Sequence, residues 1–230
     1  MNKQRLTGLQ VQNSLEKAGV FWLYPGEPKA DIPHALLTSD KHSNGYVNVG
    51  HVLKEQPEVR MAFAKGIFTA LREVWDGRID RVVGADTSST DLAGDIAKII
   101  GANHICMLKA ENNKSKRQVW SAENTSLHDR ETILHVEELI TTSSSALQVR
   151  EGLRCANPGV VVNFVPYLPV IVERSDPDNR VVAMENSKIL PLLQLCIRNY
   201  EPNFVDCPYC AVGSIAIKPK EGDNWLKLIK

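Results

Sequence analysis

The chain has 230 residues, of which 43% are hydrophobic and 23% are charged, enough apolar material to bury the core of one large domain. Lys plus Arg and Asp plus Glu number 27 each, so a general nucleic-acid-binding surface is not expected. Residues 1–10 lack the apolar segment of a secretory signal, and no stretch approaches the roughly 18 apolar residues of a membrane span. We therefore expect a cytoplasmic protein with five reduced cysteines and no membrane partner.

The first quarter of the chain predicts two helices separated by shorter apolar segments. Residues 5–19 have the spacing of an amphipathic helix, and a short apolar run follows over residues 20–23. Residues 36–50 are polar and contain glycine, which is compatible with a strand and a turn. Residues 57–74 carry apolar side chains at helical spacing and are predicted to form a helix.

The middle of the chain alternates apolar strand patterns with helical ones. Strands are predicted over residues 80–84, 104–108, 132–136, 160–165 and 170–172, and helices over 92–100 and 146–156. This alternation favours an α/β domain with a parallel sheet flanked by helices. Ligands bind such sheets at the carboxyl ends of the strands, so we expect the chemistry in the polar loops after Gly84 and Val136.

The last 45 residues differ from the middle and are predicted to form a short appendage. Residues 189–197 are expected to be helical, with Pro191 in the first turn, and a basic tail closes the chain. We divide the chain into an N-terminal helix and lead-in (1–33), a core domain (34–185) and a C-terminal appendage (186–230).

The appendage contains the sequence Cys207-Pro208-Tyr209-Cys210, which is half of a zinc site or a redox pair. Cys196 lies upstream as a third candidate ligand, and the nearest histidines in the sequence are His128 and His135. A lone pair of cysteines does not define a metal site. We therefore expect reduced, structural cysteines, with Cys207 and Cys210 as candidate zinc ligands only.

Residues 133–145 carry the clearest chemical pattern. An apolar strand delivers Glu137 and Glu138, a hydroxyl-rich loop follows, and a helix then begins. The N–H groups of the loop and the helix N-terminus attract an anion, and the hydroxyls add donors for phosphate oxygens. The two carboxylates can accept hydrogen bonds from ribose hydroxyls. The alternative is a strand before a Ser/Thr-capped helix, with an acidic pair by chance.

This segment resembles the phosphoribosyl pyrophosphate (PRPP) motif of type I phosphoribosyltransferases, an apolar strand with two acidic residues followed by Thr-Thr-Gly-Gly-Ser or similar. Glu137 and Glu138 match the acidic pair, and Thr141, Thr142 and Ser145 match the loop.

The loop departs from that pattern at Ser143 and Ser144, which stand where glycines are usual. Glycine adopts backbone conformations that serine resists, so the loop is expected to be altered. Serine keeps the N–H donor and adds a hydroxyl, so phosphate binding is still expected.

Two further segments resemble orotate phosphoribosyltransferases, a branch of the same family. Residues 37–48 look like the segment that covers the pyrimidine and ribose, with Tyr46 as its aromatic residue and Asp40 in place of a usual glycine. Val172-Glu173-Arg174-Ser175 looks like the strand end whose arginine meets the orotate carboxylate. A guanidinium suits a carboxylate because it can donate two parallel hydrogen bonds.

Two other segments match the parts of the family that bind pyrophosphate. Residues 83–89 fall at the pyrophosphate loop, where Asp86 would need a cation or a lysine to offset its charge. Residues 107–111 resemble the start of the mobile catalytic loop, with Lys109 in place and Leu108 where an arginine is usual. Each segment alone is also compatible with an ordinary polar loop. Further candidate cations in the catalytic loop are Lys114, Lys116 and Arg117.

The resemblance implies the type I phosphoribosyltransferase fold, a homodimer, and transfer of phosphoribose from PRPP to a pyrimidine-type base with Mg²⁺, orotate being the first expectation. The implied catalytic residues are Lys109, Glu137 and Glu138. The implied PRPP-binding residues are Thr141, Thr142, Ser143, Ser144, Ser145, Asp86, Thr87 and Ser88. The implied base-binding residues are Arg174, Tyr46 and Thr141.

Two alternative functions stay open. The first is a regulatory protein that keeps this fold and binds PRPP or a nucleotide without turnover, which the departures at Ser143, Ser144, Asp86 and Leu108 favour. The second is a phosphoribosyltransferase for another base.

Overall fold

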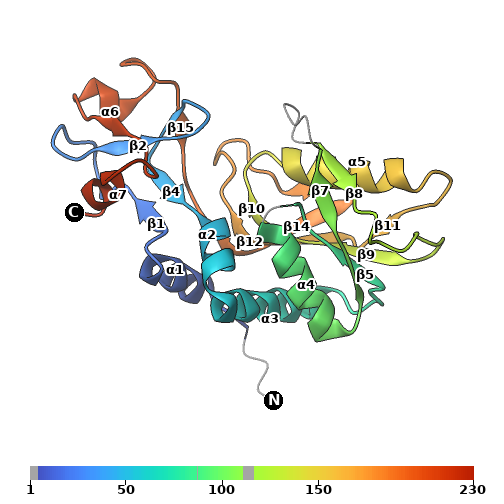
Figure 1. Ribbon diagram of the computed structural model, residues 1–230. Coiled ribbons are helices and arrows are strands. Elements are labelled where there is room, and N and C mark those ends of the chain that lie inside the picture. The colour runs from blue at the N-terminus through green and yellow to red at the C-terminus, as the bar shows by residue number, and fades with distance from the viewer. Residues whose placement is uncertain (1–4, 87, 111–116) are drawn as a thin grey trace.

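The computed structural model describes residues 5–86, 88–110 and 117–230. A core of parallel strands between helices occupies the right of Figure 1. In one part of the core, hydrogen bonds join four strands in parallel. They are, in spatial order, β11 (Asn163–Phe164), β9 (Thr132–His135), β5 (Arg81–Val83) and β6 (Asn103–Ile105).

The second part of the core sheet begins where β9 ends. After Val136 the chain continues as β10 (Glu137–Ile140), which pairs in parallel with β12 (Tyr167–Glu173). β14 (Ser187–Gln194) lies parallel to β12, and the short β13 (Ala183–Met184) closes the edge in the antiparallel direction. The buried side chains of β5, β9, β12 and β14 are mostly Val, Ile and Leu, as expected for strands covered on both faces.

Helices cover both faces of this sheet. α3 (Pro57–Val74) and α4 (Ser88–Ile100) pack on one face, and α5 (Ser144–Ala156) lies on the other (Figure 1). α1 (Gly8–Lys17) and α2 (Val49–Glu55) extend the first layer. The α3 side chains that recur at helical spacing, Phe63, Ile67, Ala70 and Leu71, are fully or almost fully buried, so its apolar stripe is what docks it.

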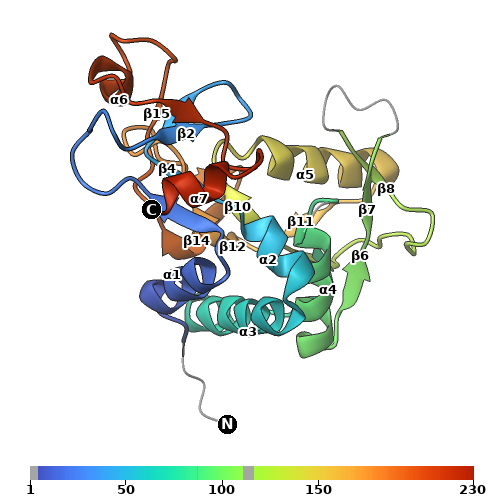
Figure 2. The same ribbon diagram turned by 60° about the vertical axis from the view of Figure 1, so that its left-hand side comes forward.

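A second, smaller unit, which we call the small lobe, lies at the upper left of Figure 1. Its mixed sheet contains, in spatial order, β15 (Asn199–Tyr200), β3 (His42–Ser43), β2 (His34–Leu36) and β16 (Ala216–Ile217). An antiparallel pair, β1 (Phe21–Leu23) with β4 (Gly45–Val47), and the short helices α6 (Pro208–Ala211) and α7 (Asn224–Leu228) complete it. Figure 2 shows the C-terminal helices beside the strands from the N-terminal part of the chain.

A hairpin stands out from the core. β7 (Met107–Lys109) pairs antiparallel with β8 (Gln118–Trp120), and the hairpin packs on α5. The predicted strand over residues 104–108 is therefore divided between β6 and β7. Among the predicted site residues, Thr87, Lys114 and Lys116 lie outside the described part of the chain.

The predicted α/β class, with a parallel sheet flanked by helices, is confirmed. The helix predicted over residues 57–74 has the same bounds as α3. The helix predicted over residues 189–197 is wrong, because most of these residues form β14. Proline is tolerated there because β14 is paired only with β12 at Pro191 and is an edge strand at that point.

The strand pairings cross the boundaries that the sequence analysis placed after residues 33 and 185. A boundary at residue 185 would separate β14 from its partner β12, and β2 and β3 share their sheet with β15 and β16. Within the described ranges, no helix is both long enough and apolar enough to cross a membrane.

Candidate functional site

The candidate site lies at the carboxyl ends of the core strands, as expected for a parallel sheet. β10 ends at Ile140 and runs into the hydroxyl loop over residues 141–143, after which α5 begins. Thr141 to Ser145 line a cavity of about 100 Å³ together with the end of β10. The N-terminus of α5 opens on this cavity, so its unpaired N–H groups and its dipole favour an anion there.

Ser143 adopts a backbone conformation that glycine adopts more easily than serine. Its φ of 61° and ψ of 5° are left-handed, whereas Ser144 is already in the helix. The Ser143 Oγ atom is buried and has no hydrogen-bond partner among the described residues. The strain and the unpaired hydroxyl occur at one residue, and the hydroxyl is a donor that a phosphate oxygen in the loop would satisfy.

We expect Ser143→Gly to be more stable than Ser143→Ala by about 1 kcal/mol, because both lose the hydroxyl but only glycine adopts a positive φ without strain. Chemical denaturation of the two variants measures this difference. Equal stabilities, or a more stable alanine variant, would show that the left-handed backbone at residue 143 is not strained.

The two acidic residues lie in different surroundings. Glu137 is 3% exposed, and its carboxylate accepts hydrogen bonds from Ser89 Oγ at 2.8 Å and from His135 Nε2 at 2.9 Å. Burial raises the pKa of Glu137 to about 7, although the hydrogen bond from Ser89 opposes the shift. Glu138 is only partly buried and lines a neighbouring cavity of about 360 Å³. Both carboxylates therefore border the site: Glu137 lines the hydroxyl-loop cavity while it is held by Ser89 and His135, and Glu138 lines the neighbouring cavity.

Arg150, a buried residue of α5, links the contact between His135 and Glu137 to residues beyond α5. Arg150 is 1% exposed, and its Nε atom lies 3.4 Å from His135 Nδ1. Its other nitrogens donate to Glu185 at 2.9 Å and to Ser187 Oγ at 2.7 Å. Since Arg150 supplies a donor to Nδ1, the His135 Nε2 atom carries the proton that is donated to Glu137. The chain of contacts fixes the strand beneath the hydroxyl loop.

Glu185 gives this network a dependence on pH. Hydrogen bonds from Arg154, and then from Arg150, lower the pKa of Glu185 to about 2. A depressed pKa means that its contribution to stability is complete above about pH 4.5 and is lost as the pH falls toward 2. We therefore expect the wild-type chain to lose more stability than Glu185→Gln on acidification through this window, as measured by denaturation at successive pH values. Parallel pH profiles would contradict this assignment.

The loop between β5 and α4 contributes Asp86 and Ser88. A Cβ atom at Gly84 would lie 2.4 Å from the carbonyl oxygen of Ser89, so only glycine lets this loop approach α4 so closely. Ser88 Oγ donates to the Gly50 carbonyl, and Ser88 lines the same cavity as Glu138.

The Asp86 carboxylate already forms a hydrogen bond within the protein. This carboxylate accepts a hydrogen bond from the Lys109 backbone N–H at 2.7 Å, and the Asp86 N–H donates to Gln118 Oε1 at 2.8 Å. Asp86 thereby joins both strands of the β7–β8 hairpin to the end of β5. Lys109 and Leu108 are exposed on that hairpin.

A larger cavity of about 510 Å³ lies between the core and the small lobe. Arg174, at the end of β12, is 8% exposed and lines it, as do Tyr46 and Thr141. Among the described residues, Arg174 Nε has no hydrogen-bond partner and no carboxylate forms an ion pair with its guanidinium. Burial lowers the pKa of Arg174 and nearby Tyr46 opposes this shift. A buried guanidinium without a partner is costly and calls for an anion.

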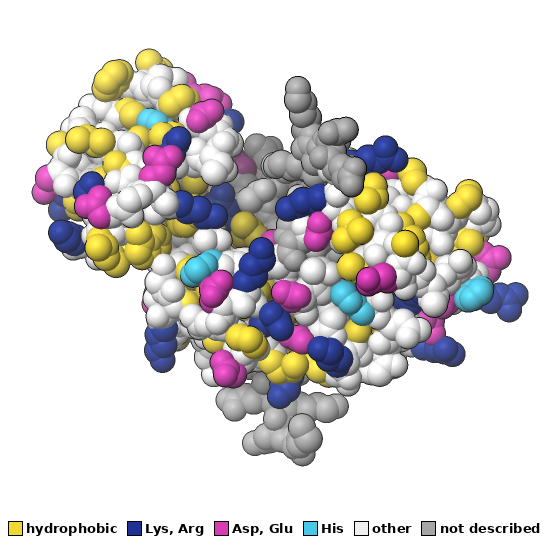
Figure 3. Space-filling view, viewed as in Figure 1, with side chains coloured by type: hydrophobic (Ala, Val, Ile, Leu, Met, Phe, Trp, Pro, Cys, Tyr) yellow, Lys and Arg dark blue, Asp and Glu magenta, His cyan; other side chains and the backbone are white. Residues whose placement is uncertain are grey.

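The C-terminal segment also lines this larger cavity, which the sequence did not predict. Lys218 and Lys220, expected to lie in a solvated tail, follow β16 and face the same space as Arg174. On the face seen in Figure 3, Lys and Arg side chains gather where the small lobe meets the core. The only feature of the sequence that could have indicated this placement is the basic character of the C-terminal tail.

The three cavities adjoin one another. Leu139 lines all of them, and Thr141 is shared by the hydroxyl-loop cavity and the Arg174 cavity. The site therefore presents an anion loop, a carboxylate and an arginine in adjoining cavities, the groups that suit a phosphate, a sugar and an anionic ring.

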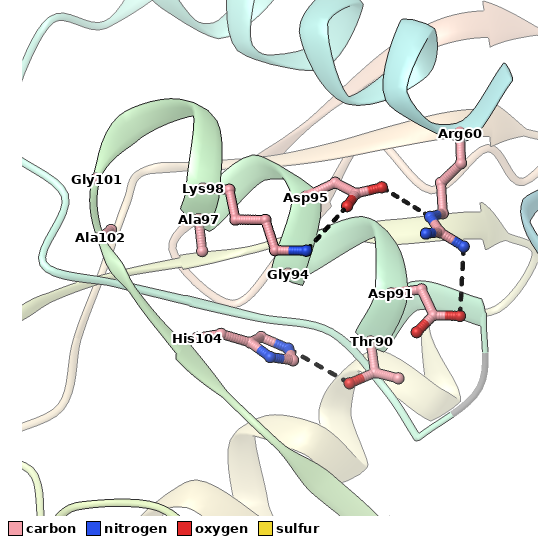
Figure 4. Close-up of a pocket in the computed structure, with 10 residues that line it drawn as sticks. All are labelled: Arg60, Thr90, Asp91, Gly94, Asp95, Ala97, Lys98, Gly101, Ala102 and His104. Carbon is pink, nitrogen blue, oxygen red and sulfur yellow. Dashed lines mark hydrogen bonds and ion pairs between the residues drawn. The ribbon is translucent and has the colours of Figure 1, made fainter. Parts of the chain in front are cut away.

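Another hollow, of about 530 Å³, lies on the outer side of α4 (Figure 4). Its charged side chains are already paired: Arg60 contacts Asp95 at 2.7 Å and Asp91 at 3.6 Å, and Lys98 contacts Asp95 at 3.7 Å. We do not place the site there, because these groups neutralise one another. Cys207 and Cys210 lie in the small lobe beside two histidines, and Cys196 is exposed.

Comparison with known proteins agrees with this geometry. No family model matches the chain. It is 28% identical over 207 residues to an orotate phosphoribosyltransferase from Caldanaerobacter subterraneus, covering 89% of this chain and 97% of the relative. The fold is similar to that of orotate phosphoribosyltransferase from Aeropyrum pernix, with a TM-score of 0.56 at 15% identity over 80% of this chain and 93% of that one.

A UMP synthase from Leishmania donovani is similar as well, with a TM-score of 0.55 at 14% identity. The match covers 82% of this chain but only 36% of the synthase. These likenesses to solved structures show the fold alone. Together with the sequence similarity, they confirm the resemblance to type I phosphoribosyltransferases, and to the orotate enzymes in particular.

Proposed function

We propose that this chain, which shares the fold and the sequence motifs of orotate phosphoribosyltransferases, transfers phosphoribose from PRPP to orotate and releases pyrophosphate. The observation that carries the proposal is the buried guanidinium of Arg174, which forms no ion pair with any described residue, in the cavity that Thr141 connects to the hydroxyl loop. Orotate brings a carboxylate to that guanidinium, and the phosphate of PRPP brings an anion to the loop.

In this arrangement a ring nitrogen of the base displaces pyrophosphate from C1 of the ribose, and no protein nucleophile is required. The transition state resembles an oxocarbenium ion, so the protein contributes positioning and charge stabilisation. Residues 141–145 hold the 5′-phosphate, Glu138 accepts hydrogen bonds from the ribose hydroxyls, and Glu137 maintains the strand end below it. Lys109, at the start of the segment between β7 and β8, approaches the leaving pyrophosphate.

The residues present fit a Mg²⁺ ion bound together with PRPP. Mg²⁺ is usually held by one or two carboxylates and by substrate phosphates, and Glu138 is a partly exposed carboxylate beside the hydroxyl loop. Asp86 fits less well, because it accepts the Lys109 N–H. Mg²⁺ would supply charge neutralisation on the pyrophosphate. We further infer a cytoplasmic homodimer without a nucleic-acid partner, as the resemblance and the balanced charge suggest.

The experiment that tests the base assignment offers a panel of bases, including orotate, uracil, adenine and hypoxanthine, with PRPP and Mg²⁺, and identifies the nucleotide product. We expect product with orotate alone, because uracil lacks the carboxylate and the purines also offer none to Arg174. A product from uracil or a purine, and none from orotate, would assign the chain to another base.

A further inference from the structure

Four metal-binding side chains meet inside the small lobe, away from the candidate active site. His34 lies in β2, His42 in β3, Cys207 caps α6 and Cys210 lies within it. One donor atom from each lies within 4.8 Å of every other. His34 and Cys207 are fully buried, and His42 is 8% exposed. The two histidines are separated from the cysteines by more than 160 residues of sequence, so folding brings them together.

The distances match the edges of a zinc tetrahedron. Zinc bonds of 2.0–2.1 Å to nitrogen and 2.3 Å to sulfur imply edges of about 3.3 Å between nitrogens and about 3.6 Å between nitrogen and sulfur. His34 Nε2 lies 3.0 Å from His42 Nδ1, 3.7 Å from Cys207 Sγ and 3.8 Å from Cys210 Sγ. Cys210 Sγ lies 3.2 Å from His42 Nδ1.

Hydrogen bonds prepare His34 as a ligand. Ser214 Oγ donates to the Ile32 carbonyl at 2.7 Å and lies 2.8 Å from His34 Nδ1, so it accepts the Nδ1 proton. This contact leaves the lone pair of Nε2 facing the other three side chains. Partners of this kind orient histidine ligands in metal sites.

The sheet and the apolar cluster of the small lobe are both small. Its sheet strands are two or three residues long, and its apolar cluster is built around Trp22, Tyr24, Leu37 and Tyr209. Small cores of this kind usually need a disulfide or a metal. Cys207 and Cys210 are free thiols rather than a disulfide.

We propose that His34, His42, Cys207 and Cys210 bind one Zn²⁺ ion in a closed tetrahedral site that fastens the C-terminal segment to the β2–β3 hairpin. A complete set of two thiolates and two imidazoles favours zinc and leaves no open position for catalysis. The turn of that hairpin, residues 37–40, lines the Arg174 cavity, so the metal also fixes one wall of it. His34 and His42 supply the two further ligands that Cys207 and Cys210 need for a tetrahedral site. The histidines lie far from the cysteines in the sequence.

The test is the metal content of the full chain, purified without a histidine tag and measured by mass spectrometry. We expect about one zinc per chain. Cys207→Ser and Cys210→Ser should each retain less than about one tenth of it at equal free zinc. Cys155→Ser and Cys196→Ser, which alter exposed cysteines outside the cluster, should retain all of it. Co²⁺ in place of zinc should give the visible bands of tetrahedral thiolate coordination.

A second measurement uses the unaltered chain, in case the cysteine variants fail to fold. A chelator should increase the number of thiols that react with a disulfide reagent by two, because Cys207 and Cys210 are released together. A zinc-supplied chain that holds no metal and gives no cobalt bands would overturn the proposal. So would equal loss of zinc in Cys196→Ser, or thiol reactivity that the chelator does not change.

Discussion

Arg174→Met should lower kcat/KM for orotate by about 10- to 150-fold while raising the thermal stability of the free chain. The first effect follows because a hydrogen-bonded charge pair contributes about 1.5–3 kcal/mol. The second follows because the substitution removes a buried charge that has no partner among the described residues. Steady-state kinetics with varied orotate and thermal denaturation without ligand measure the two effects.

Arg180→Met is the matched control for this substitution. Arg180 forms an ion pair with Glu173, which is 1% exposed, and Arg180 does not line the Arg174 cavity. Its replacement should lower stability, since it leaves Glu173 buried without its cation, and should leave the KM for orotate unchanged. If Arg174→Met lowers stability and leaves orotate affinity intact, Arg174 is a structural arginine and the orotate assignment fails.

Lys109→Ala should lower kcat by about 100-fold or more with little change in stability. The Lys109 side chain is exposed, and its backbone N–H, which holds the hairpin to Asp86, is retained in the variant. A cation that stabilises developing charge on the leaving group acts mainly in the transition state, so its loss appears in kcat. Initial rates at saturating PRPP and orotate measure the effect.

Lys98→Ala provides the comparison for Lys109. Lys98 is an exposed lysine on α4 that pairs with Asp95 on the outer side of the core. Its loss should change kcat by less than about twofold, because surface pairs contribute little. Equal rates for Lys109→Ala and the wild type would show that the start of this hairpin takes no part in the reaction.

Local sequence was sufficient for the elements that position the hydroxyl loop. The apolar run before Glu137 and the helical pattern over residues 146–156 identified the strand and helix on either side of the loop, because each pattern is complete within about fifteen residues. The departure at Ser143 was also visible from the sequence. Its consequence, a left-handed residue whose hydroxyl has no partner among the described residues, could be seen only from the backbone conformation.

Pairings between distant segments could not be read from the sequence. The apolar run around Pro191 fits a helix or a strand equally well, and only its pairing with β12 decides between them. Nothing in the sequence linked His34 and His42 to the cysteines. In the structure β16 pairs with β2, and Cys207 and Cys210 lie beside the two histidines. The same pairing places Lys218 and Lys220 at the Arg174 cavity.

The burial of Glu137 could not be predicted from the sequence either. The motif treats two adjacent carboxylates alike, but side chains in a strand alternate between its faces, so the two have different surroundings. Here Glu137 is buried against His135 and Ser89 at the hydroxyl-loop cavity, and Glu138 lines the neighbouring cavity. Which member faces inward depends on how β10 sits between α4 and α5.

The most direct test of the account is the release of pyrophosphate from PRPP by the wild-type chain with Mg²⁺ and orotate, followed alongside the binding of PRPP. We predict that PRPP binds and that pyrophosphate is released only when orotate is present. Binding of PRPP without release, with orotate or any other base, would contradict the proposed reaction and would favour a regulatory protein on the same fold.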